Sequence, residues 1–247
     1  EYLDGPEVSL FAITDGRIAL PLQPAQDFKR VGDGDTGPNT GGMGAYTPLP
    51  WAPDGLVDAI MERVVDPTIA EMARRGTPFA GLLYAGLALT SKGLRVVEFN
   101  CRFGDPETQA VLSLLESPLG EVLYAASTGT LDSVGDLVWN PGSAVIVVLA
   151  ADGYPDTPAR GGVIVGKRLI TSLDNVHVVH AGTGLSAESE LVADGGRVLG
   201  VVARAATLAD ARRDVYAAID EIHFPTGFHR TDIAERAASG QIGTPAL

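Results

Sequence analysis

Cysteine is almost absent from this sequence. Cys101 is the only one among 247 residues, so the chain cannot form an internal disulfide. A chain without disulfides is typical of a reducing compartment, and we therefore expect a cytoplasmic protein. One cysteine and four scattered histidines also offer no zinc-binding spacing. Disulfide-stabilised secreted domains and zinc modules are thus excluded.

Basic residues and long apolar runs are scarce as well. The 18 lysine and arginine residues are outnumbered by 31 aspartate and glutamate residues, which gives a formal net charge of −13. This balance argues against a broad nucleic-acid surface, although backbone N–H groups, a metal and a few arginines can hold phosphates locally. The longest apolar run, residues 144–151, is far shorter than the roughly 18 residues that cross a membrane. We expect neither nucleic acid nor membrane as a partner.

The first residues do not look like a natural start. There is no initial methionine, and Val8, Leu10 and Ala12 alternate like a strand already under way. No signal-peptide pattern is present. We therefore expect the chain to be part of a longer protein whose N-terminal part is missing. Its 45% apolar and 20% charged residues are typical of a folded globular chain with one or two domains.

Up to about residue 140, the sequence predicts antiparallel strands and helices. Gly76 should end the first helix, and Pro67 should break or kink it. In the second helix, Asp105 is the expected N-cap and Pro106 the first helical residue. Residues 27–50 are rich in glycine and have no regular period, so we expect a functional or mobile loop. The predicted strands are 7–14, 17–23, 79–90 and 93–100, and the predicted helices are 53–76, 105–117 and 118–131.

From about residue 140 onward, the pattern changes to short β-runs between glycine-rich turns. Thr207 then opens an amphipathic helix. We therefore place a domain boundary near residue 140. Residues 1–140 are expected to form an α+β lobe, and residues 141–247 a small β-rich domain with a closing helix.

The stretch GLRVVEFNCRFGDPETQ, residues 93–109, begins like a buried strand and ends in polar groups. Strand alternation puts Glu98 and Asn100 on one face, with their Cα atoms ~6.6 Å apart. A carboxylate and an amide oxygen suit Mg²⁺ or Mn²⁺. Arg102 can bind a carboxylate or phosphate, and the helix start at Asp105 favours an anion. The alternative is structural: Glu98 pairs with Arg102, Asn100 caps a turn, and Asp105 is only an N-cap.

The glycine-rich loop offers a second candidate site. Its segment GPNTGGMGAY presents repeated backbone N–H groups with little side-chain bulk. Such a composition suits a phosphate or a small substrate that lies close to the backbone. The alternative is a flexible loop that binds nothing.

Four motifs, taken in order, resemble a known family. EYLDGPEVS, DFKRVGDGDTGPNTGGMGAY, GLLYAGL and VVEFNCRFGDPETQ are similar to the later part of the phosphoribosylamine–glycine ligases (glycinamide ribonucleotide synthetases), a purine-pathway family of the ATP-grasp superfamily. The resemblance continues through GGRVLGVVA to the closing helix. Other ATP-grasp enzymes share Glu-x-Asn on a strand, but not NTGGMGAY together with CRFGDPETQ. The resemblance implies that residues 1–140 are the C-terminal lobe of an ATP-grasp fold, an antiparallel sheet with helices, and that a small β-rich domain follows.

The resemblance also implies a reaction. In this family, ATP activates the carboxylate of glycine as an acyl phosphate, and the amine of 5-phosphoribosylamine attacks it. The products are glycinamide ribonucleotide, ADP and phosphate. The implied partners are ATP, glycine, 5-phosphoribosylamine, Mg²⁺ or Mn²⁺, and the missing N-terminal part, which carries a glycine-rich lid and a lysine. Three lysines are present here, none after a lid-like loop, so we expect half an ATP site and little or no turnover.

Roles for individual residues follow from the same resemblance. The implied metal ligands are Glu98 and Asn100. The implied catalytic residues are Arg102, which would hold the carboxylate or acyl phosphate, and Asp105. The implied ATP-binding residues are Glu1 and Leu3 at the adenine edge and Glu7 at the ribose. The implied substrate-binding residues are Asp27, Lys29, Arg30, Asn39, Gly41, Gly42, Met43 and Gly44.

Three alternatives stay open from the sequence. Lys29 and Arg30 can equally be solvated loop charges. Another ATP-grasp carboxylate ligase or carboxylase would need Glu98 and Asn100 but would not depend on glycine. A non-catalytic fragment would need neither residue.

Overall fold

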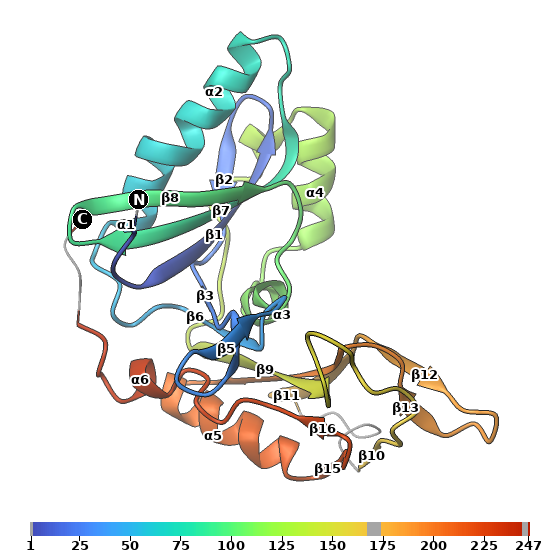
Figure 1. Ribbon diagram of the computed structural model, residues 1–247. Coiled ribbons are helices and arrows are strands. Elements are labelled where there is room, and N and C mark those ends of the chain that lie inside the picture. Colours follow the sequence, from blue (N-terminus) through green and yellow to red (C-terminus); the bar gives the residue numbers. More distant parts are fainter. Residues whose placement is uncertain (1, 167–173, 244–246) are drawn as a thin grey trace.

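The computed structural model describes residues 2–166, 174–243 and 247, and it contains two stacked bodies (Figure 1). The upper body is a four-stranded antiparallel sheet in the order β2-β1-β7-β8. Its strands are β1 (Glu7–Asp15), β2 (Ala19–Pro21), β7 (Ala80–Thr90) and β8 (Gly93–Asn100). The predicted strands 7–14 and 17–23 pair antiparallel as β1 and β2, and the predicted strands 79–90 and 93–100 pair antiparallel as β7 and β8.

Helices cover both faces of this upper sheet. Successive side chains of a strand point to opposite faces, and apolar side chains on each face of this sheet pack against helices. Leu10 and Leu83 pack in one cluster with the helices that follow residue 55, whereas Phe11 and Ile13 pack against α4 in another. The helix over 53–76 is interrupted as predicted at Pro67: α1 (Leu56–Ile60) leads into a π-helical turn, η1 (Met61–Val65), and then α2 (Asp66–Arg74). Proline lacks the N–H that a regular turn would use, so the helix widens just before it.

Strand β8 differs from the expected buried strand. Val96, Val97 and Phe99 are each about two-fifths exposed, because β8 lies at the edge of the sheet. A register shift sets Glu98 opposite Gly86 but Val96 opposite Leu87. Val97 is thus an extra, bulged residue, and the simple alternation predicted from Val96 to Asn100 is wrong at this point.

The next two helices lead down to the second body. Helix α3 (Glu107–Ser113) has Pro106 at its N-cap, so the predicted N-cap at Asp105 is wrong. The Asp105 carboxylate instead forms an ion pair with Arg197 (3.2 Å) and accepts a hydrogen bond from Gln109 (3.2 Å). Helix α4 (Leu119–Thr128) ends at Gly129 in the left-handed region, as a glycine C-cap allows.

The lower body is a six-stranded sheet that takes strands from both halves of the chain. The order is β11-β14-β9-β6-β3, with β16 also paired to β9. The strands are β3 (Gln26–Asp27), β6 (Gly44–Thr47), β9 (Ser143–Ala151), β11 (Val176–His180), β14 (Arg197–Ala205) and β16 (Gly227–Phe228). Gly44 lies opposite Val147 in this sheet. The domain boundary near residue 140 stays a prediction, but backbone pairing crosses it.

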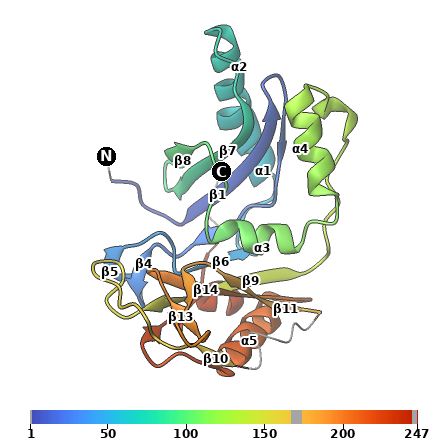
Figure 2. The same ribbon diagram turned by 90° about the vertical axis from the view of Figure 1, so that its right-hand side faces the viewer.

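Helix α5 (Leu208–Ile219) packs under the lower sheet (Figures 1 and 2) and begins as predicted. The Thr207 hydroxyl accepts a hydrogen bond from the Asp210 backbone N–H (3.1 Å), which is an N-cap bond. The remaining short elements are β4 (Arg30–Gly32), β5 (Thr36–Asn39), η2 (Leu131–Ser133), β10 (Val165–Gly166), β12 (Thr183–Leu185), β13 (Leu191–Ala193), β15 (Ile222–His223) and α6 (Glu235–Ala238).

The glycine-rich segment 27–50 is more ordered than its sequence pattern indicates. It holds part of β3 and all of β4, β5 and β6. Backbone hydrogen bonds form these short strands without an apolar period to reveal them. Within the described ranges, no helix is both long and apolar enough to span a bilayer.

Candidate functional site

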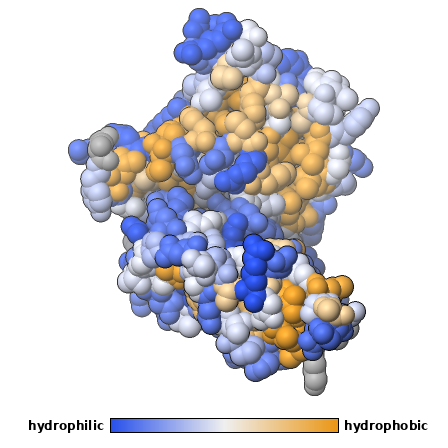
Figure 3. Space-filling model, turned by 45° about the vertical axis from the view of Figure 1, so that its right-hand side comes forward, coloured by the Kyte–Doolittle hydropathy of each residue, from blue (hydrophilic) through white to orange (hydrophobic). Residues whose placement is uncertain are grey.

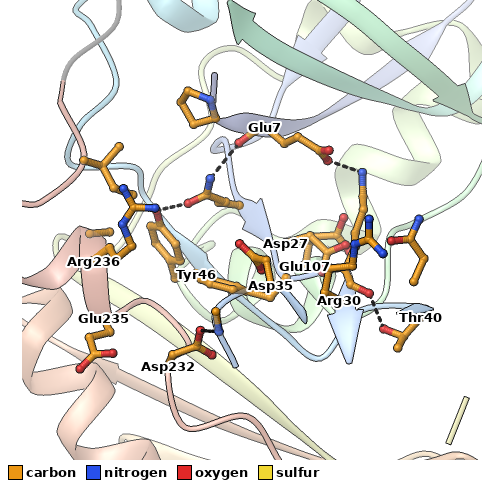
Figure 4. A pocket seen from close by; sticks show the side chains of 18 of the residues that line it. Glu7, Asp27, Arg30, Asp35, Thr40, Tyr46, Glu107, Asp232, Glu235 and Arg236 are labelled. Carbon is orange, nitrogen blue, oxygen red and sulfur yellow. Dashed lines mark hydrogen bonds and ion pairs between the residues drawn. The ribbon is translucent and has the colours of Figure 1, made fainter. Parts of the chain in front are cut away.

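A cavity of about 1370 Å³ lies between the two bodies. Figure 3 shows a waist at this level, where hydrophilic residues gather below the more hydrophobic surface of the upper body. The start of β1, the segment 26–41, the end of β8 and the start of α3 line it, together with residues 231–243 from the far end of the sequence (Figure 4). Tyr46 of β6 and Tyr84 of β7 also line it, so the site is assembled from several separate parts of the chain.

Most of the predicted site residues line this cavity. They are Glu7, Asp27, Lys29, Arg30, Asn39, Gly41, Glu98, Arg102 and Asp105. Leu3, Gly42, Met43, Gly44 and Asn100 are not among the lining residues, and Glu1 lies outside the described residues.

Met43 and Gly44 have a packing role instead. Met43 is fully buried, and a Cβ atom on Gly44 would lie 2.7 Å from the backbone oxygen of Ile146. Neither residue is placed to touch a ligand in the cavity. Gly42 lies behind the lining, where a Cβ atom would meet the Asp27 carboxylate at 2.7 Å.

Glu98 and Asn100 lie side by side at the end of β8. The Asn100 side-chain N–H donates a hydrogen bond to Glu98 Oε1 (3.2 Å), so the two groups reach the same point despite the bulge. This leaves the amide oxygen of Asn100 and the second carboxylate oxygen of Glu98 as ligands that suit Mg²⁺ or Mn²⁺. Among the described residues, no three His, Cys, Asp or Glu side chains form a metal-binding group. A cation here would therefore take few protein ligands and complete its shell with water or phosphate oxygens, as Mg²⁺ commonly does.

The contacts of Arg102 do not support the alternative in which it pairs with Glu98. Arg102 donates from its guanidinium to the backbone oxygen of Phe103 (2.9 Å), and no ion pair joins it to Glu98 among the described residues. Arg102 is one of the residues that line the cavity. A guanidinium in such a position can bind a carboxylate or phosphate in a bidentate manner.

Lys29 is not a freely solvated loop charge. It forms an ion pair with Glu7 across the mouth of the cavity (Figure 4). Burial by itself would lower the pKa of Lys29, but the hydrogen bond and the negative charge of Glu7 raise that pKa above its usual value. Arg30 is exposed at the rim and donates to the backbone oxygen of Gly37 (2.7 Å).

Asp27 and Glu107 are neighbouring acidic residues in the cavity lining (Figure 4). Glu107 is 3% exposed and accepts a hydrogen bond from the Ser9 hydroxyl (3.2 Å), which also contacts the Tyr84 hydroxyl (2.9 Å). Asp27 Oδ1 is closed to solvent and has no hydrogen-bond partner. Burial, and then the nearby charge of Glu107, raises the pKa of Asp27 well above the ordinary value for aspartate.

Sequence reasoning missed two groups of lining residues. Glu107 lies in the first turn of the predicted helix 105–117 and was given no role in the site, although its position directly after the Gly-Asp-Pro turn was a usable signal. The segment after α5 contributes Thr231, Asp232, Glu235 and Arg236. No local pattern in that segment indicates a site, because its contribution depends on contact with residues about 200 positions earlier.

The described part of the cavity is strongly acidic. Nine acidic and four basic side chains line it, and one of the four, Lys29, is already paired with Glu7. A polyphosphate would be repelled by such a surface unless cations accompany it. The arrangement suits a metal-bound phosphate, an anion held by Arg102 and a ligand that carries an amine.

Comparison with family models identifies two matches. Residues 1–108 match "Phosphoribosylglycinamide synthetase, ATP-grasp (A) domain", and residues 144–236 match "Phosphoribosylglycinamide synthetase, C domain". The chain is 56% identical over 241 residues to a phosphoribosylamine–glycine ligase of Mycobacterium tuberculosis, covering 98% of this chain and 56% of the relative. It is 50% identical over 240 residues to a chloroplastic enzyme of that name from Arabidopsis thaliana, covering 96% of this chain and 45% of the relative.

Solved structures agree with these matches. A crystal structure of phosphoribosylamine–glycine ligase from Thermotoga maritima superposes with a TM-score of 0.84 at 35% identity, over 95% of this chain and 57% of that one. A biotin carboxylase domain from a single-chain bacterial carboxylase shares the fold alone, with a TM-score of 0.62 at 16% identity over 97% of this chain and 54% of that one. The predicted α+β fold of the ATP-grasp class is confirmed. The chain spans somewhat more than half the length of the M. tuberculosis and T. maritima relatives.

Proposed function

Because the chain belongs to the phosphoribosylglycinamide synthetase family, we propose that it carries the metal-binding and substrate-binding half of an ATP-dependent ligase. The complete ligase, by which we mean this sequence extended to the length of its relatives, joins glycine to 5-phosphoribosylamine. The products are glycinamide ribonucleotide, ADP and phosphate. A cytoplasmic location is part of this proposal.

One observation carries the proposal: Glu98 and Asn100 meet at the end of β8, beside the cavity. In the proposed site they hold Mg²⁺ or Mn²⁺, which would neutralise the phosphates of ATP. Arg102 binds the carboxylate of glycine or the acyl phosphate formed from it. Asp105 contributes to catalysis from the turn that precedes α3, where its ion pair with Arg197 sets its position.

In the proposed site the nucleotide side and the substrate side adjoin, because Glu7 forms an ion pair with Lys29. Glu7 binds the ribose hydroxyls of ATP, and Glu1 and Leu3 meet the adenine edge through their backbone. The substrate side consists of Asp27, Lys29, Arg30 and the loop that includes Asn39, Gly41 and Gly42. Met43 and Gly44 support that loop through their packing in the core and do not contact the substrate.

The proposed reaction requires that two negatively charged groups be brought together. The γ-phosphate of ATP and the glycine carboxylate repel each other, so cations must hold them in line before an acyl phosphate can form. The amine of 5-phosphoribosylamine then attacks the acyl carbon, and phosphate leaves. We propose that the rest of the relatives' length, which the resemblance places before residue 1, supplies further groups that contact ATP.

Substitution of Glu98 tests the proposal in the complete ligase. We expect Glu98→Gln to lower kcat by roughly 100-fold or more, because even the loss of a residue that only hydrogen-bonds to a metal ligand costs about 10–100-fold. ADP release should be measured with glycine and phosphoribosylamine omitted in turn. Wild-type ADP release that does not depend on glycine would favour another ATP-grasp ligase instead.

A matched control comes from Glu62, an exposed glutamate on the π-helical turn. Glu62→Gln removes the same charge at a distance from the cavity and should leave the rate unchanged. If Glu98→Gln also turns over at the wild-type rate, the metal role of this strand end is wrong.

A further inference from the structure

Arg230 is a buried charge that the proposed reaction does not use. It follows β16 in the C-terminal part of the chain and is only 1% exposed. A buried guanidinium is costly unless each of its N–H groups finds a partner. Its partners therefore indicate what the residue does.

The partners of Arg230 lie on two segments about 200 residues apart. On its own side, it donates two hydrogen bonds to the Asp232 carboxylate, each of 2.7 Å. On the other side, it donates to Asp35 (2.9 Å) and to the backbone oxygen of Arg30 (3.0 Å). Its guanidinium also lies 4.9 Å from the centre of the Phe28 ring. Arg230 thus joins the C-terminal segment to the β4–β5 hairpin.

Further hydrogen bonds reinforce the same junction. The Gly34 backbone N–H donates to Asp232 (2.8 Å), and the Thr231 backbone N–H donates to Asp33 (2.8 Å). We call residues 230–232, together with their partners in residues 30–35, the Arg230 latch. Asp33, Gly34, Thr231 and Asp232 all line the cavity, so the latch is part of the cavity wall.

The β4–β5 hairpin buries little of its own surface. All four residues of β5 are exposed, and the pairing of β4 with β5 contains a register shift. A two-stranded hairpin with little burial is marginally stable by itself. The polar bonds of the latch join this hairpin to residues 230–232, which lie ahead of α6 in the chain.

We propose that Arg230 is a positioning residue: through the latch it holds residues 30–39 in the shape that binds the substrates. The C-terminal half of the chain thereby sets the geometry of the substrate side without contacting the reacting atoms. The physical part of this proposal concerns the hairpin alone. Its catalytic consequence rests on the proposed ligase function.

Hydrogen exchange on this chain tests the physical part. In Arg230→Met, the backbone amides of residues 30–39 should exchange at least 10-fold faster, while those of β9 and β14 stay protected. Asp35→Asn is a second variant, for the case that Arg230→Met fails to fold. It removes the charge of one latch partner but leaves the hydrogen bonds between Arg230 and Asp232 intact, so the buried guanidinium keeps a carboxylate partner. Arg230→Lys keeps the charge but not the paired geometry and should give an intermediate rate.

The control is Arg213→Met, which removes an exposed arginine of α5 that pairs with Asp210 and Asp214. It should not change exchange in residues 30–39. If folded Asp35→Asn and Arg230→Met both leave the exchange of this segment unchanged, the latch does not position it and the proposal is overturned.

Kinetics of the complete ligase test the catalytic consequence. We expect Asp35→Asn and Arg230→Met to raise the KM for glycine or phosphoribosylamine about 10-fold, while their KM for ATP stays within 2-fold of the wild-type value. In the Arg213→Met enzyme, every KM should stay within 2-fold of the wild-type value. A purely structural role would lower the amount of active enzyme and leave every KM unchanged, which would overturn the proposal. Wild-type enzyme that fails to release ADP with glycine would refute the ligase function, whereas the exchange result would still stand.

Discussion

At the scale of single residues, Asp27 shows how burial changes the chemistry of a side chain. The sequence presents it as a polar residue at the start of a glycine-rich loop. In the structure its Oδ1 atom is closed to solvent, has no hydrogen-bond partner and lies near Gly42. Burial and the nearby Glu107 carboxylate both disfavour its charged form, and the pKa is raised accordingly.

This raised pKa predicts a pH-dependent cost to stability. Above the ordinary aspartate pKa, the unfolded chain releases a proton that the folded protein keeps, so the folded state binds more protons. The free energy of unfolding therefore falls as pH rises through the window between the unfolded and folded pKa values. Asp27→Asn has no proton to release and should be more stable than wild type at pH 7, by on the order of 1 kcal/mol, the usual size for one substitution.

Urea unfolding between pH 4 and pH 8, followed by tryptophan fluorescence, measures the effect. The advantage of Asp27→Asn over wild type should grow with pH. Asp54→Asn, on an exposed turn, is the control and should show no such trend. An Asp27→Asn variant that is less stable than wild type at pH 7 would contradict the prediction.

At the scale of elements, the glycine-rich segment depends on close approach of its backbone to α3. Gly42 has φ +110°, and a Cβ atom there would lie 2.3 Å from the Pro106 ring and 2.7 Å from Asp27. Gly34 also has positive φ, +64°, but a Cβ atom there would meet nothing within 4 Å. An alanine at either position would have an unfavourable backbone conformation, but only an alanine at position 42 would also overlap with neighbouring atoms.

We expect Gly42→Ala to be the more damaging of the two substitutions. Gly34→Ala should cost about 1–2 kcal/mol of unfolding free energy, the usual penalty for an L-residue in the left-handed region. Gly42→Ala adds overlap with Pro106 and should cost about 1–3 kcal/mol more. Equal losses in urea unfolding would show that the contact between this segment and α3 is not tight.

At the scale of the whole molecule, the charge of the cavity limits what the chain can bind by itself. Its described lining has nine acidic side chains against four basic ones. We therefore expect this chain to bind Mg-ATP with a Kd weaker than about 1 mM, which corresponds to only about −4 kcal/mol, and to turn over little. Isothermal titration checks this. A Kd in the low micromolar range would mean that the described residues already hold ATP.

Much of the fold was predictable because it depends on neighbours in the sequence. The hairpins of the upper sheet follow from alternation and turn residues, the interruption before α2 from Pro67, and the start of α5 from Thr207. The exposure of β8 was not predictable, because an apolar strand has the same pattern at a sheet edge as at its centre. Strands β3 to β6 are too short and too rich in glycine to show an alternating apolar pattern.

The sequence by itself determined the family, the α+β class and a strand end that places an acid and an amide together, since each depends on residues close in the chain. Only the tertiary structure decided that Glu107 is buried beside Asp27, that β6 and β9 share a sheet across residue 140, and that Arg230 anchors the β4–β5 hairpin. These features arise from contacts between segments about 80 to 200 residues apart. Burial and charge pairing at such distances depend on how the chain packs, which no local pattern records.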